Sequence, residues 1–190
     1  MAMLSAAGVS NLGTGAFALS KGQAESLITT VNADIQRVIN SGKSEGSMIR
    51  DFERIFAKHA DVGVMARSSL GVARRGASSS QLRSYTKAFQ GYVARKYGKR
   101  FREFAGAEIS VLKSQKSKRG YLVSTRVKLR GRSAFAVDWQ VSDASGRTRV
   151  FDLIIEGISM LRLERQEIGQ MLDRRGGDLN KLIAHLKTAS

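Results

Sequence analysis

Apolar residues recur at three- and four-residue spacing through the first half of the chain, and this spacing predicts helices. Breaks at Ser41-Gly42 and Gly71 end two of the runs, and the serines at 78–80 offer N-caps for the last one. Four helices are therefore expected, over residues 22–40, 48–56, 61–71 and 80 to about 103.

After residue 103 the period of the pattern changes from about 3.6 to 2, as alternating strands require. In the clearest case, Val123 and Val127 fall on one face while Arg126 and Lys128 fall on the other. Four strands are predicted, over residues 108–113, 121–130, 135–141 and 150–155. The connections are short, which favours antiparallel neighbours and a four-stranded meander.

The stretch 150–172 reads as a buried strand, a break at Glu156-Gly157 and a helix. Two closing helices are expected over 157–173 and 177–188, separated by Gly176-Gly177. Helices, then strands, then helices is an α+β order, with the sheet covered by helices on one side. We assign residues 21–188 to a single domain.

Catalytic chemistry is not indicated by the polar residues. His59 and His185 are far apart and each lies near the end of a helix, where the helix dipole favours a cation. The Ser-x-x-Lys match at 84–87 lacks its partner motifs. Glu164 and Glu167 lie among arginines, which predicts an ion-paired helix surface. We predict a binding protein rather than an enzyme, without metal or cofactor.

The net charge of the chain indicates what kind of partner it binds. Lys+Arg is 32 against Asp+Glu 16, a formal charge of +16, so the partner surface is expected to be acidic. Basic residues gather on the fourth helix and in the first hairpin turn. Three interpretations stay open: a solvated basic face, attraction to an anionic membrane surface, and a nucleic-acid-binding module.

Residues 1–20 differ from the rest of the chain because they carry no charge. The small residues of Ala16-Phe17-Ala18 match the end of a secretory signal, where the peptidase accepts small side chains three apart. Cleavage there would leave Leu19 as the first residue of an exported protein. The segment is therefore a signal-peptide remnant or, alternatively, a flexible N-terminus.

Three segments closely resemble the MlaC family. They are the run FQGYVARKYGKRF at 89–101, VDWQV at 137–141 and FDLIIEGISM at 151–160, followed by Arg-Gln-Glu at 165–167. The likeness covers about residues 24–187, and the Asp…Glu-Gly-x-Ser-Met pattern is its most specific part.

The resemblance implies a periplasmic phospholipid-binding protein, of the kind also called a toluene-tolerance auxiliary component of an ABC transporter. It implies a nuclear transport factor 2-like cradle whose curved sheet and helices enclose acyl chains in an apolar cavity. The implied ligand is a phospholipid, shuttled between the outer and inner membranes through transient membrane contact. The implied partners are an inner-membrane ABC transporter with an MCE-domain subunit and an outer-membrane lipoprotein complex, with no specific nucleic acid.

The apolar sheet face and the aromatic stripe of the fourth helix are the predicted walls of that cavity. The predicted lining residues are Met65, Leu70, Phe89, Tyr92, Val93, Tyr97, Phe101, Val111, Val123, Val127, Val137, Trp139, Phe151, Leu153, Ile155 and Met160. The alternative is that these side chains pack against one another in a dry core.

Overall fold

The computed structural model describes residues 19–190, apart from the side chain of Phe101. The Ala16-Phe17-Ala18 motif, and with it the predicted signal remnant, lies outside the described residues, as does the lining role predicted for Phe101.

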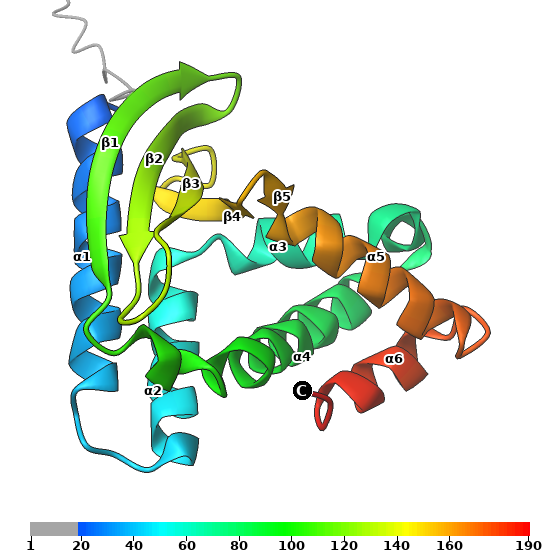
Figure 1. Cartoon of the computed structure of the whole chain (residues 1–190). Coiled ribbons are helices and arrows are strands. Elements are labelled where there is room, and N and C mark those ends of the chain that lie inside the picture. The colour runs from blue at the N-terminus through cyan, green and yellow to red at the C-terminus, as the bar shows by residue number, and fades with distance from the viewer. Residues whose placement is uncertain (1–18) are drawn as a thin grey trace, which may run out of the picture.

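Along the described chain, four α-helices come before a sheet and two α-helices follow it (Figure 1). The helices are α1 (Lys21–Ile39), α2 (Glu45–His59), α3 (Val62–Ser69), α4 (Ser79–Gly98), α5 (Met160–Asp173) and α6 (Leu179–Leu186), with 3-10 turns η1 (Gly71–Gly76) and η2 (Phe101–Phe104). The strands are β1 (Glu108–Ser117), β2 (Gly120–Lys128), β3 (Phe135–Ser142), β4 (Arg149–Ile155) and β5 (Ile158–Ser159). This arrangement confirms the α+β class.

The sheet is an antiparallel meander in the order β1-β2-β3-β4-β5, so the prediction of four strands was one short. The extra strand is only two residues long and pairs Ile155 with Ile158. Glu156 and Gly157 form the turn, with φ of 48° and 81°. Positive φ at both central residues is what a tight two-residue hairpin needs, so the predicted break folds back before the helix begins.

The long fourth helix ends at Gly98 rather than near residue 103. A Cβ on Gly98 would lie 2.9 Å from the Ile49 Cγ1 atom, so glycine permits close packing of α4 on α2. The start of α4 follows the prediction, because Ser78 and Gln81 form a capping box there.

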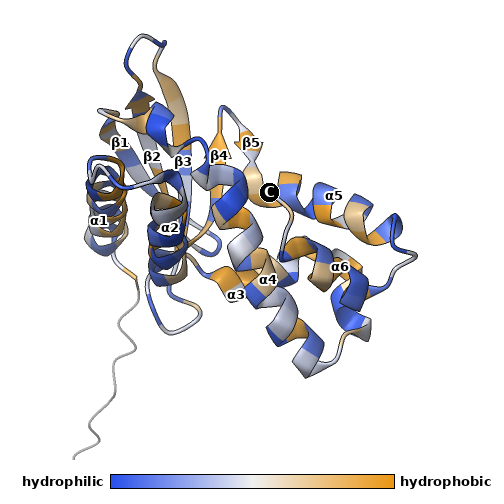
Figure 2. Cartoon of the chain, turned by 90° about the horizontal axis from the view of Figure 1, so that it is seen from below, coloured by the Kyte–Doolittle hydropathy of each residue, from blue (hydrophilic) through white to orange (hydrophobic). Residues whose placement is uncertain are grey.

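Two separate hydrophobic cores lie side by side in the molecule. In the sheet core, α1 packs over one face of β1, β2 and β3. In the helical core, α3, α4, α5 and α6 pack on one another. Figure 2 shows α1 nearly end-on beside the strands, with the bundle of α3–α6 on the other side.

A backbone junction lies where the two cores meet, in addition to the packing of α2 on both α1 and α4. Ala60, after α2, forms an isolated parallel bridge with Val150 at the start of β4. The Asp61 N–H donates to the Val150 carbonyl oxygen at 2.7 Å, and the Arg149 Nη1 group donates to the Ala60 carbonyl oxygen at 3.2 Å.

Candidate functional site

The strand register places the predicted sheet wall on one face. Val123 lies opposite Trp139, and Val137 lies opposite Ile155. Trp139 in turn lies opposite Leu153. Because cross-strand partners project from the same face, these five side chains form a continuous apolar surface across β2, β3 and β4.

Most of this wall is buried beneath α1. Val123, Val127, Val137 and Trp139 are buried in the sheet core, which also contains Ile28 and Val31 of α1. The Trp139 Nε1 group donates to the Thr125 Oγ1 atom at 3.0 Å, so the indole is fixed within the layer.

The predicted helix wall belongs to the other core. Leu70, Phe89, Tyr92 and Val93 are buried there, and Met65 and Tyr97 pack against them while partly exposed. The structure thus brings together the members of each wall and places the two walls in adjacent, separate cores.

Three further predicted lining residues lie apart from these sets. Val111 is 40% exposed, beside an irregularity in β1 that shifts the register before Lys113. Phe151 is buried, with the Arg119 guanidinium carbon 6.0 Å from its ring centre. Met160 is partly buried at the first position of α5.

The sheet face is not fully covered at its β4–β5 end. Phe135, Leu153 and Ile155 are only partly buried, and Ile158 is 59% exposed. We call these four residues the apolar edge. They continue the buried Val137 face towards the start of α5, and contiguous exposed apolar side chains are typical of binding surfaces.

A buried carboxylate fixes the corner beside the apolar edge. The two oxygens of Asp152, which is 5% exposed, accept from the Ser159 hydroxyl at 2.6 Å and the Leu161 N–H at 2.9 Å. The Ser159 hydroxyl caps α5 by accepting from the Arg162 N–H at 3.1 Å. The most specific motif in the sequence therefore sets how α5 leaves the sheet.

A charged cluster joins α4 to α5. The Lys96 Nζ group lies 2.7 Å from Glu164 Oε1 and 2.5 Å from Glu167 Oε2, and the Tyr97 hydroxyl donates to Glu164 Oε1 at 2.6 Å. Glu164 is 3% exposed, and its Oε2 atom has no partner. The prediction that Glu164 and Glu167 pair with arginines on a helix surface was wrong.

The cluster shifts the pKa values of its members. Burial acts to lower the pKa of Lys96, but its hydrogen bonds to Glu164 and Glu167 outweigh burial, so the pKa lies above its usual range. Burial, reinforced by the Glu164 charge, raises the pKa of Tyr92 to about 12. Lys96 therefore stays charged at neutral pH.

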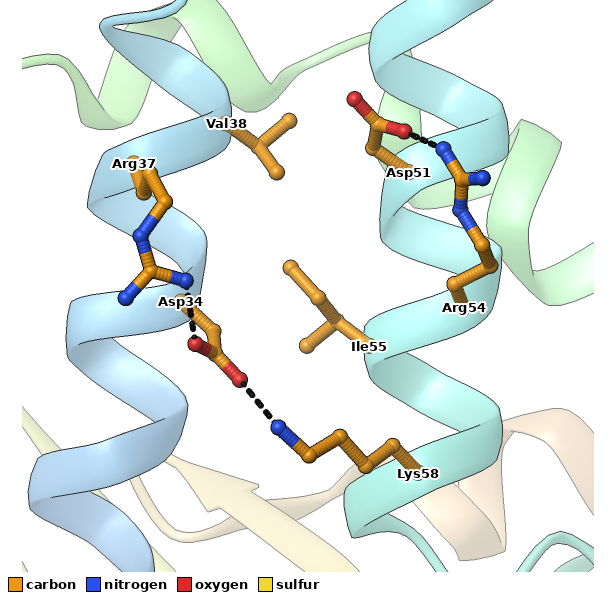
Figure 3. A pocket seen from close by; sticks show the side chains of 7 residues that line it. All are labelled: Asp34, Arg37, Val38, Asp51, Arg54, Ile55 and Lys58. Carbon is orange, nitrogen blue, oxygen red and sulfur yellow. Dashed lines mark hydrogen bonds and ion pairs between the residues drawn. The ribbon is translucent and has the colours of Figure 1, made fainter.

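A second polar cluster links α1 to α2 around Asp34. This carboxylate accepts from His59 Nε2 at 2.8 Å, from Arg37 at 2.7 Å and from Lys58 at 3.2 Å. Next to it is a hollow of about 240 Å³, whose lining also includes Asp51 (Figure 3). The sequence analysis explained His59 by its position near a helix end. In the structure His59 is also buried and pairs with Asp34.

Both carboxylates could have been found from the sequence. Glu164 lies between Leu161 and Ile168 on the apolar stripe of α5, and Asp34 follows Val31 on that of α1. A charged residue at a core position needs a buried partner. The position of Glu164 and Asp34 on an apolar stripe therefore indicated their burial better than the charged residues next to them in the sequence did.

Two negative findings apply to residues 19–190. Within this part of the chain, no helix is both long and apolar enough to cross a bilayer. Over the same residues, the His, Asp and Glu side chains form no group of three or more that would hold a metal ion.

Comparison with known proteins identifies the family. Residues 26–188 match the family model described as MlaC protein. The chain belongs to the MlaC family. A phospholipid-binding protein from Ralstonia solanacearum, solved in complex with a phospholipid, has the same fold as this MlaC-family chain. The two are 16% identical with a TM-score of 0.71, over 86% of this chain and 94% of the other. The resemblance seen in the three sequence segments is confirmed.

Proposed function

We propose that this protein is a periplasmic phospholipid carrier that shuttles lipid between the outer and inner membranes. The observation that carries the proposal is the apolar edge, an uncovered continuation of the sheet face in a chain of the MlaC family. The bound phospholipid of the Ralstonia solanacearum protein supports the choice of ligand.

The energetics of lipid in water explain what such a surface does. Each exposed methylene costs about 0.8 kcal/mol, so two acyl chains in water cost tens of kcal/mol. A carrier needs an apolar wall for the tails and does no covalent chemistry. In our proposal the tails lie along Leu153, Ile155 and Met160 and insert between the sheet wall and the helix wall. The headgroup remains at the surface.

Uptake then requires the two cores to part. Ala60, Asp61 and Val150 make backbone contacts where the two cores meet, while Phe89 of one core and Val137 of the other are buried on either side. If the two cores moved apart around these contacts, the predicted lining residues of both walls would face one common space for the tails.

The wider system follows from family membership. We propose that an inner-membrane ABC transporter with an MCE-domain subunit and an outer-membrane lipoprotein complex exchange lipid with this carrier, and that a secretory signal directs it to the periplasm. The aromatic residues of α4 do not favour the nucleic-acid alternative, because Tyr85, Phe89 and Tyr92 are buried and not free to stack on bases.

The test is the lipid content of the purified protein, measured by organic extraction and mass spectrometry. We expect phospholipid in the native protein, and several-fold less of it in Leu153→Trp and Ile155→Trp, because the larger ring fills the space of a tail. Leu112→Trp, at a 62% exposed position on β1, is the matched control and keeps its lipid.

Melting temperature separates lost binding from lost folding. The proposal predicts that the delipidated Trp variants melt close to the delipidated parent. Native protein without phospholipid, combined with sequence-selective binding of an oligonucleotide, would favour the nucleic-acid-binding module instead.

A further inference from the structure

Two hollows in the surface of the protein are both lined by cations, and they differ in how those cations are paired. Around the hollow between α1 and α2, Arg37 and Lys58 pair with Asp34, and Arg54 pairs with Asp51 (Figure 3). The charge there is satisfied within the protein.

The second hollow, of about 110 Å³, lies between η1 and α5. It is lined by Gly71, Val72, Arg74, Arg75 and Arg165, and we call it the arginine hollow. Among residues 19–190, the three guanidinium groups have no ion pair or hydrogen bond. Three like charges around one small space repel one another, and an anion bound there would relieve that repulsion.

The local backbone holds these arginines together across a long sequence separation. Gly71 has a φ of 59°, which favours glycine, and a Cβ at this position would lie 3.2 Å from the Arg165 Nε atom. The absence of a side chain therefore lets Arg165 of α5 approach η1. In Figure 1 the blue-green turn of η1 lies beside α5, at the end of the molecule away from the sheet.

The chemistry of the lining selects the kind of anion. A guanidinium presents a planar fork of donors that matches the oxygens of a phosphate group. Val72, at the rim, is 71% exposed, more than any other large apolar side chain among the described residues. A bilayer of acidic phospholipids has anionic headgroups at its surface and apolar chains below them. An exposed apolar side chain beside unpaired arginines is suited to both layers.

We propose that the arginine hollow is a docking site for an anionic bilayer, with a lipid phosphate held by Arg74, Arg75 and Arg165 and Val72 inserted among the lipids. This assigns the membrane contact to a place distinct from the apolar edge, where the tails of the carried lipid are proposed to bind. The site goes beyond carrier function and does not depend on it.

The first experiment measures sedimentation of the full chain with vesicles of phosphatidylcholine, with and without phosphatidylglycerol. The triple variant Arg74→Gln, Arg75→Gln, Arg165→Gln is compared with Arg126→Gln, Arg130→Gln, Arg147→Gln, which removes the same charge from exposed positions on and beside the sheet. We expect the hollow variant to lose roughly a hundredfold in partitioning to the anionic vesicles. The control loses far less. An equal loss in both variants overturns the proposal, because net charge alone would then explain binding.

The second experiment tests insertion of the side chain at the rim. The chain has no cysteine, so Val72→Cys creates a unique attachment point for a polarity-sensitive dye. We expect a blue shift with anionic vesicles only, and no shift for Leu112→Cys labelled in the same way. An unshifted spectrum at position 72 contradicts insertion. Co-purified lipid is measured on every variant, so loss of docking with lipid content intact is distinguished from failure of the carrier function.

Discussion

The two cores of this protein are held together in different ways. The sheet core consists mainly of aliphatic side chains beneath α1, with the Thr125–Trp139 hydrogen bond within the layer. The helical core adds charged hydrogen bonds from Lys96 to Glu164 and Glu167. Apolar burial is non-directional, whereas charged hydrogen bonds fix geometry. We infer that the helix wall is the fixed side of the lipid site and the sheet wall the yielding one.

The largest expected effect comes from neutralising the charge in the helical core. Glu164→Gln leaves Lys96 with Glu167 as its only carboxylate and weakens the bond from Tyr97. Removal of one partner of a buried ion pair is strongly destabilising, and we expect a loss of about 3 kcal/mol in the free energy of unfolding. Urea denaturation of the delipidated protein measures it.

The matched control for that variant is Glu45→Gln, which removes the same charge from an exposed position in the first turn of α2. Its unfolding midpoint is expected to stay close to that of the parent protein. If the two variants unfold at the same urea concentration, the helical core is not held by its charges and the contrast between the cores fails.

A smaller effect is expected at the cluster that joins α1 of the sheet core to α2. Asp34→Asn removes the charge that accepts from His59, Arg37 and Lys58. Hydrogen bonds to charged groups contribute about 1.5–3 kcal/mol, and two of these donors are exposed, so we expect a loss of about 2 kcal/mol at neutral pH.

The dependence of that loss on pH identifies its cause. The hydrogen bond from His59, followed by those from Arg37 and Lys58, holds the pKa of Asp34 well below its ordinary 3.8 despite burial. A lowered pKa stabilises the fold fully above the unfolded-state value, and this stabilisation is lost progressively as the pH falls from that value towards the folded-state pKa. The difference between parent and Asp34→Asn is therefore expected to be constant near neutrality and to shrink below about pH 4. A constant difference down to pH 2 would contradict the ionic explanation.

Periodicity predicted the order of elements because each period reflects a local backbone geometry. It also placed Val123, Val137 and Trp139 on one sheet face, as the register confirms. The β5 strand was missed because two residues are too few to show a period. The pattern did not place the start of α5 after Ser159 either, because the cap depends on Asp152 from the preceding strand.

Contacts between elements that lie far apart in the sequence were harder to predict. An apolar period shows that Phe89 is buried but not which element covers it, so the separation into two cores was not predicted. The +16 charge likewise gave no position for the arginine hollow, since Arg74 and Arg165 meet only through the path of the chain.

The smallest expected effect lies in the sheet core. The Thr125 hydroxyl, at a 1% exposed residue, accepts from Trp139 Nε1 and donates to the Val137 carbonyl oxygen at 2.8 Å. Thr125→Val keeps the shape but leaves the indole donor unpaired, which costs about 1 kcal/mol where the neighbouring packing is unchanged. Thr125→Ser keeps the hydroxyl and serves as the control for the hydrogen bond. Trp139 is the only tryptophan in the sequence, so its fluorescence during urea unfolding reports on this core directly. A loss for Thr125→Val as large as that for Glu164→Gln would show that the sheet wall is fixed by polar contacts too, and the yielding wall would have to be sought elsewhere.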